Sequence, residues 1–176
     1  MYYGIALSAK VVIVNAGKML YREPRPFWTD VTIPMKELDC SSEYGNPSGH
    51  SLSAAGLALI PALDIIQHAV YGSNLSKAVK IMLGVLTMVI AIGYAWSMGY
   101  SRVVVGVHSW NQIIYGWLLG VWVSLALHFA VWPWLKTHAT SLTQNKQKRS
   151  LWLYLLVSTA IFLGLLALQL GIYFAL

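Results

Sequence analysis

The amino-acid sequence predicts an all-α fold, a bundle of helices that span a membrane. Of the 176 residues, 57% are hydrophobic and only 10% are charged, whereas soluble domains carry about 25% charged residues. A helix needs roughly 20 mostly apolar residues to cross a bilayer. Four segments have this length and composition: residues 51–71, 79–96, 108–134 and 151–174. We therefore expect the lipid bilayer to be a partner of this chain.

The beginning of the chain, residues 1–20, is a fifth apolar segment, which Lys10, Asn15 and Lys18 interrupt. Because Lys10 lies inside the apolar stretch and no small-residue cleavage site follows, the segment is not a secretory signal. We interpret it as the last part of a spanning helix whose beginning lies upstream of Met1. The prediction is thus a polytopic bundle of about five spanning helices, truncated at its N-terminus.

The chain divides into one functional unit and a C-terminal extension. Residues 1–134 form the unit, residues 135–150 a polar loop, and residues 151–176 an additional transmembrane helix. Within the unit, Gly116 and Gly120 are four residues apart, a spacing that lets membrane helices pack closely. The connection at residues 21–47 carries four of the six prolines, and long loops of this kind are often functional.

The net charge of +6 is explained better by membrane topology than by a nucleic-acid partner. The basic residues form no stripe that alternates with aromatic residues, so no nucleic-acid surface is predicted. The run QNKQKR at residues 144–149 is placed in the cytoplasm by the positive-inside rule. The opposite end of the bundle then faces the lumen or the exterior. Cys40 is the single cysteine and forms no intrachain disulfide, and the sequence specifies no oligomeric state.

The stretch NPSGHS, residues 46–51, has the features of an anion site at a helix start. Pro47 suits the first turn of a helix, and Asn46 or Ser48 can cap it. The backbone N–H groups around Ser48 and Gly49 are then expected to be unpaired, and the helix dipole favours an anion beside them. His50 is placed to give or take a proton there.

Three cations and a second histidine lie on the same predicted side of the membrane as this helix start. Lys18 and Arg25 precede it, while Arg102 and His108 stand between two later apolar segments. Arginine binds a tetrahedral oxyanion through two parallel hydrogen bonds. The combination of cations, backbone donors and two histidines predicts a phosphate-transfer site. It contains no cluster of metal ligands, so neither a metal nor another cofactor is expected.

Taken singly, each of these residues also has an ordinary structural reading, such as a snorkelling lysine or a capping histidine. Their joint placement favours a site. The other polar residues of the apolar segments are interpreted as structural. Asp64 and His68 are one helical turn apart and are expected to satisfy each other, whereas His128 and His138 show no partner in the sequence.

Three motifs in this order resemble the type 2 phosphatidic acid phosphatase (PAP2) superfamily, which includes glucose-6-phosphatases and vanadium haloperoxidases. The motifs are Lys18-x6-Arg25-Pro26, Pro47-Ser48-Gly49-His50 and Ser101-Arg102-x5-His108. The resemblance implies a PAP2/haloperoxidase-type helical core. Because the haloperoxidases are soluble, the membrane composition of this chain favours a phosphatase.

The resemblance also implies a role for each motif residue. His108 would attack phosphorus and form a phosphohistidine, and His50 would be the general acid and base. The phosphate oxygens would be held by the remaining motif residues, which are Lys18, Arg25, Ser48, Gly49 and Arg102. No metal is required in this scheme.

Gln112 stands where the family usually has an aspartate that orients the nucleophilic histidine. It follows His108 by four residues, so the two side chains share a helix face. The amide oxygen can accept a hydrogen bond from the ring N–H, although it carries no negative charge. Dolichyl diphosphatases and glucose-6-phosphatases resemble this chain in having glutamine here, so we expect an active enzyme in which Gln112 orients His108.

The leading interpretation is an integral-membrane phosphatase that hydrolyses a lipid phosphate or a polyprenyl diphosphate. The resemblance to dolichyl diphosphatases adds the endoplasmic reticulum to the expected locations. One alternative is a glucose-6-phosphatase-like enzyme acting on a soluble sugar phosphate. The other is a phosphate-binding pseudoenzyme or membrane scaffold without turnover.

Overall fold

The computed structural model describes residues 2–33 and 42–137, and the single positions 156, 159, 160, 163, 164 and 167. Over the two continuous ranges every regular element is helical, which confirms the all-α prediction. The elements are α1 (Tyr2–Tyr21), α2 (Pro26–Thr29), α3 (Gly49–Asp64), η1 (Ile65–Val70), α4 (Lys77–Val104), α5 (Trp110–Ala126) and η2 (Leu127–Val131). The two η segments are π-helical turns that continue α3 and α5.

Three helices are long and apolar enough to cross a membrane: Gly49–Val70, Lys77–Val104 and Trp110–Thr137. They confirm three of the four predicted spans. The predicted span at residues 151–174 lies, apart from single positions, outside the described residues, as does the polar loop from residue 138 onward. α1 is one continuous helix, but it is not among the helices whose composition suits a span.

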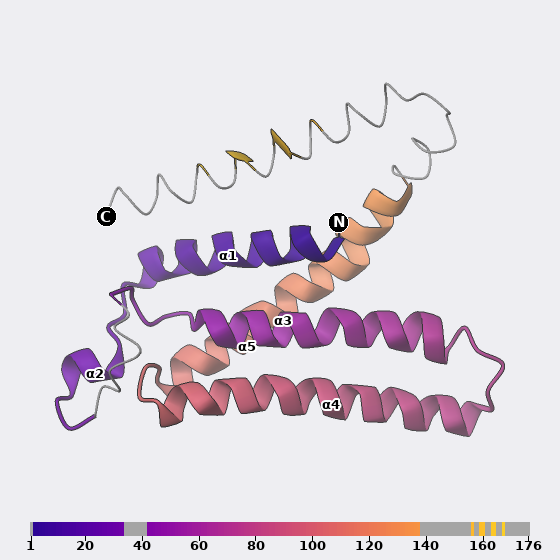
Figure 1. Cartoon of the computed structure of the whole chain (residues 1–176), viewed down its shortest axis with the longest axis horizontal. Coiled ribbons are helices and arrows are strands. Elements are labelled where there is room, and N and C mark those ends of the chain that lie inside the picture. The colour runs from indigo at the N-terminus through magenta and orange to yellow at the C-terminus, as the bar shows by residue number, and fades with distance from the viewer. Residues whose placement is uncertain are drawn as a thin grey trace.

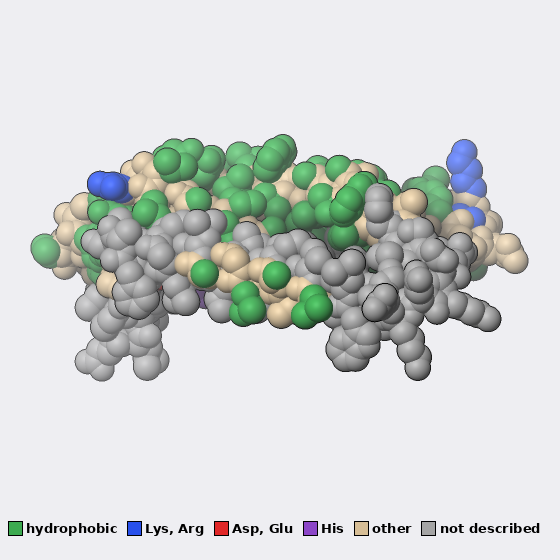
Figure 2. Space-filling view, turned by 90° about the horizontal axis from the view of Figure 1, so that it is seen from above, with side chains coloured by type: hydrophobic (Ala, Val, Ile, Leu, Met, Phe, Trp, Pro, Cys, Tyr) green, Lys and Arg blue, Asp and Glu red, His purple; other side chains and the backbone are tan. Residues whose placement is uncertain are grey.

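The helices form a bundle in which α3 is central, because α3 contacts α1, α4 and α5. α1, α3 and α4 run along the long axis of the molecule, whereas α5 crosses them obliquely (Figure 1). The end of α1, the start of α3, the end of α4 and the start of α5 meet at one end, next to α2 (Figure 1). Among the described residues seen in Figure 2, most coloured side chains are hydrophobic, and Lys and Arg side chains lie near the two ends.

The contact between α3 and α5 depends on the two glycines of the small-residue pair. A Cβ atom on Gly116 would lie 2.7 Å from the backbone oxygen of Ser48. A Cβ atom on Gly120 would collide with the backbone oxygen of Leu52. The predicted close-packing seam is confirmed, since the absence of both side chains lets the backbones approach.

Lys10 joins α1 to the other two helices from inside the bundle. The residue is only 1% exposed, and its ammonium group lies against Gly56 of α3, beside the hydroxyl of Ser124 of α5. A Cβ atom on Gly56 would occupy the position of that ammonium group. The glycine therefore provides the space that the lysine fills.

At the end of the bundle far from α2, the polar contacts differ from those predicted. Asp64 accepts a hydrogen bond from Tyr3 (2.6 Å) and lies 3.5 Å from Nδ1 of His128. Nε2 of His128 is 3.1 Å from the side-chain oxygen of Gln67. The predictions that Asp64 would pair with His68 and that His128 has no partner are wrong. The π-helical turn begins directly after Asp64, and its wider spacing leaves His68 exposed.

Candidate active site

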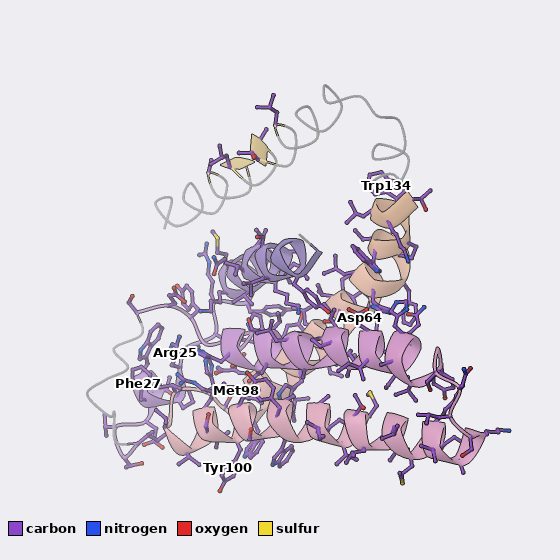
Figure 3. The ribbon with its side chains drawn as sticks, turned by 45° about the vertical axis from the view of Figure 1, so that its right-hand side comes forward. Arg25, Phe27, Asp64, Met98, Tyr100 and Trp134 are labelled. Atoms are coloured by element: carbon purple, nitrogen blue, oxygen red, sulfur yellow. The ribbon has the colours of Figure 1, made fainter. Side chains whose placement is uncertain are left out.

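A cavity of about 420 Å³ lies near the end of the bundle where the four helix ends meet. α1, α3, α4 and the segments before α3 and α5 form its wall. Six of the eight predicted site residues line it: Lys18, Arg25, Gly49, His50, Arg102 and His108. Arg25 and Met98, both in this wall, are labelled in Figure 3. Residues from three distant parts of the sequence therefore meet at one cavity.

Arg25 is fixed in the wall by two backbone carbonyl groups. It directly precedes α2, which begins with Pro26, and the residue is only 3% exposed. Its Nε donates to the backbone oxygen of Glu43 (2.7 Å), and one terminal nitrogen donates to the backbone oxygen of Val107 (3.3 Å). A guanidinium group has five N–H donors in a rigid fork. The two bonds thus set the plane of the guanidinium group in the cavity wall.

Lys18 forms an ion pair with the carboxylate of Glu43, and both residues line the cavity. The hydrogen bond from Lys18 lowers the pKa of Glu43, against the opposing effect of burial. Sequence reasoning missed Glu43, because nothing in the acid-containing loop distinguished it from its neighbours. In the free protein this carboxylate is the anion bound to Lys18.

The start of α3 differs in part from the anion nest that was predicted. Ser48 is the N-cap and Pro47 precedes the helix rather than forming its first turn. The N–H of Ser48 donates to the backbone oxygen of Gln112 (3.1 Å), so the prediction that this group is unpaired is wrong. The Ser48 hydroxyl accepts from the Ser51 hydroxyl (3.0 Å) and is fully buried. Ser48 therefore lies behind the cavity wall, and its contact with phosphate stays a prediction.

His108 and Gln112 are held together at the start of α5. Nδ1 of His108 is 3.2 Å from Oε1 of Gln112, and both residues are buried. The same Oε1 accepts a bond from the backbone N–H of Ser109 (3.3 Å), the N-cap of α5. Ser109 and Gln112 thus form a capping box, the Ser-x-x-Gln pattern that begins many helices. The bond to the N-cap fixes the amide oxygen beside the imidazole.

Glu23 lies on the far side of Gln112, although it falls in the variable spacer between Lys18 and Arg25. Nε2 of Gln112 donates to the Glu23 carboxylate (3.1 Å) and to the backbone oxygen of Pro24 (3.0 Å). Sequence reasoning missed Glu23, since the six-residue spacing specifies only Lys18 and Arg25 at its two ends and not the residues between them.

Burial lowers the pKa of His108 to about 4, and the positive charge of Arg25 acts in the same direction. The hydrogen bond that His108 donates to Gln112 opposes the shift, and the positive charges of Arg102 and Lys18 add to it. The imidazole is therefore neutral at neutral pH. A neutral imidazole has a lone pair on one ring nitrogen, which is the state that a nucleophile requires.

A family model described as the PAP2 superfamily matches residues 1–137, more than three quarters of the chain. The chain belongs to this family. The PAP2 motifs recognised in the sequence are the segments that form the cavity wall. The PAP2 assignment also agrees with the three membrane-spanning helices.

Two curated proteins and one solved structure are similar to this PAP2 chain. Phosphatidylglycerophosphatase B of Bacillus subtilis (strain 168) is 32% identical over 131 residues, which cover 63% of this chain and 61% of the relative. Undecaprenyl-diphosphatase of Sulfolobus acidocaldarius is 30% identical over 121 residues, which cover 68% of this chain and 49% of the relative. The crystal structure of a transmembrane PAP2 type phosphatidylglycerolphosphate phosphatase from Bacillus subtilis has a TM-score of 0.52 at 20% identity. It covers 82% of this chain and 58% of that one. The chain thus spans about half to three fifths of the length of these relatives.

Proposed function

We propose that this PAP2 protein is an integral-membrane phosphatase that hydrolyses a lipid phosphate or a polyprenyl diphosphate. The observation that carries the proposal is the composition of the cavity. Its lining includes three cations and two histidines together with the apolar side chains of Val11, Leu57 and Met98. Val11 is seven residues before Lys18 on α1, about 10 Å along the helix at 1.5 Å per residue.

This apolar wall favours a lipid over a sugar phosphate. A headgroup phosphate would bind at the cations while its acyl or prenyl chain follows the apolar wall between the spanning helices. A sugar has no chain to cover that wall, so its binding would leave apolar surface in contact with water. The names of the two curated relatives, one acting on a phospholipid phosphate and one on a prenyl diphosphate, support a substrate of this class.

The proposed reaction begins with attack by Nε2 of His108 on phosphorus. Nδ1 is bonded to the Gln112 oxygen, so the ring proton is on Nδ1 and the lone pair is on Nε2. As the N–P bond forms, the bond from phosphorus to the leaving oxygen breaks, and His50 gives its proton to that oxygen. Water then transfers a proton to His50 and attacks phosphorus. The N–P bond breaks, orthophosphate leaves, and both histidines regain their starting protonation states.

The positive charge for this reaction is proposed to come from the chain itself. Lys18, Arg25 and Arg102 would stabilise the three equatorial oxygens, whose negative charge grows toward the transition state. Gly49 lines the cavity at the first turn of α3, where a backbone N–H can contribute. We propose that the cavity opens on the lumenal or extracellular side. The endoplasmic reticulum, the location implied by the dolichyl diphosphatase resemblance, stays a prediction.

The test is orthophosphate release by the detergent-solubilised protein, with His108→Ala as the matched control. The substrates are undecaprenyl diphosphate, phosphatidylglycerophosphate, phosphatidic acid and glucose 6-phosphate, each with and without EDTA. We expect release from at least one lipid, unaffected by EDTA and abolished in the variant. Release only from glucose 6-phosphate would identify the sugar enzyme. Vanadate binding without turnover on any substrate would identify a pseudoenzyme.

A further inference from the structure

A chain of hydrogen bonds runs from the buried His108 through the buried Gln112 to the half-buried Glu23. We infer that Glu23 is a positioning residue for the proposed reaction. Through Gln112 it fixes the tautomer of His108 and supplies the negative charge that the family's aspartate would supply directly. The inference rests on the proposed function, in which His108 is the nucleophile. Glu23 lies in the spacer of the first motif and is not one of the residues that the motif specifies.

The orientation of the Gln112 amide follows from the groups around it. The Glu23 carboxylate and the Pro24 carbonyl can only accept hydrogen bonds, so the NH₂ end of the amide must face them. The backbone N–H of Ser109 can only donate, so the amide oxygen must face Ser109. His108 is on the oxygen side, and its Nδ1 must therefore carry the proton. At 1% exposure, Gln112 is shielded from water that could replace these partners.

Glu23 is placed so that its charge is directed at Gln112. Its carboxylate also accepts bonds from the side-chain amides of Asn46 (2.7 Å) and Asn111 (3.1 Å). Lys18, in contrast, pairs with the carboxylate of Glu43, and Arg25 donates to the backbone oxygen of Glu43. Neutral amides orient a carboxylate without cancelling its charge. The carboxylate can then polarise the Gln112 amide and favour the positive charge that develops on the imidazole ring as the phosphohistidine forms.

A purely structural role for Glu23 makes a different prediction. Its backbone oxygen accepts a bond from Gly45 (2.8 Å), and its side chain joins Asn46 and Asn111. Loss of these contacts alone would loosen the loop before α3 and weaken substrate binding. It would not depend on which residue stands at position 112. The two roles are therefore separated by exchanging the charged residue at position 23 with the neutral residue at position 112.

The experiment compares Glu23→Gln, Gln112→Glu and the double variant in the phosphatase assay. Glu23→Gln is expected to lower kcat about tenfold with little change in KM, since it removes charge that matters most in the transition state. Gln112→Glu alone places two carboxylates face to face and should lower kcat more, on the order of 100-fold. In the double variant the charge is moved to position 112, and we expect kcat about tenfold above that of Gln112→Glu.

Asp30→Asn is the control, because Asp30 is an exposed carboxylate that accepts hydrogen bonds from Thr32. It should match the unmodified protein. If the fold loss of kcat in the double variant equals the product of the losses in Glu23→Gln and Gln112→Glu, then Glu23 does not act through Gln112 and the inference is refuted. An unmodified protein without turnover would refute the proposed function instead.

Nitrogen-15 NMR of the imidazole rings, with His108→Ala for assignment, then decides the inference separately. We expect the Nδ1–H tautomer, and the Nε2–H tautomer would overturn it.

Discussion

Gly116→Ala tests whether the close approach of α5 to α3 holds the two halves of the site together. The added Cβ atom would lie 2.7 Å from the backbone oxygen of Ser48 and 3.2 Å from Cβ of Ser51. A Cβ atom essentially never lies closer than 3.0 Å to a heavy atom to which it is not bonded. The helices must therefore separate by about 0.3 Å. Overpacking of this kind destabilises by about 1–3 kcal/mol.

The same displacement reaches the catalytic groups. The hydrogen bond from the Ser48 N–H to the backbone oxygen of Gln112, which is 3.1 Å long, would lengthen. His50 would also move relative to His108. Since a misplacement of about 1 Å can lower a rate 100-fold, we expect kcat to fall several-fold. The free energy of unfolding would be measured by denaturant titration in mixed micelles, and kcat by phosphate release.

Gly84→Ala on α4 is the matched control, because a Cβ atom there has nothing within 4 Å. Its free energy of unfolding should stay within about 0.5 kcal/mol of the unmodified value, as is usual for open surface sites. The reasoning would be refuted if Gly116→Ala behaved like Gly84→Ala in both stability and kcat.

Three further predictions concern the charged groups of the cavity. Arg25→Lys should lower kcat/KM on the order of 100-fold in the phosphatase assay, because an ammonium group cannot reproduce both carbonyl bonds and still bind phosphate bidentately; an unchanged value would exclude the proposed role. His108 reacts when neutral and has a pKa of about 4, so on the acid side kcat/KM should decline only as the pH falls toward 4; an acid-side decline centred near pH 6.5 would show that burial does not lower the pKa. Glu43→Gln frees Lys18 from its carboxylate partner and should tighten vanadate binding several-fold in calorimetry, whereas weaker binding would show that Glu43 helps to hold the anion.

The three spanning helices and six of the residues that line the cavity could be predicted from the sequence because their signals are local. Apolar length specifies a spanning helix, and each motif places its residues at fixed distances along one segment. The seam at Gly116 and Gly120 is equally local, since the spacing alone puts both glycines on one helix face.

The parts that the sequence did not predict depend on contacts between distant segments. Glu23 meets Gln112 across 89 positions of the chain, and no periodic pattern indicates such a contact. The N–H of Ser48 is paired with a carbonyl of α5, so the helix-start rule alone gave a wrong expectation. Likewise, the π-helical turn after Asp64 changes the angular spacing on which its pairing with His68 was predicted.

The buried Lys10 constrains how the protein can assemble in the membrane. An ammonium group at the centre of a helix that faces lipid costs about 2.5–3.5 kcal/mol by insertion scales. The space that shelters it, between Gly56 and Ser124, is formed only when α3 and α5 are already together. α1 leaves the ribosome before α3 and α5, yet it gains its stable position only after these later helices have associated. The order of synthesis and the order of docking are therefore opposite for this helix.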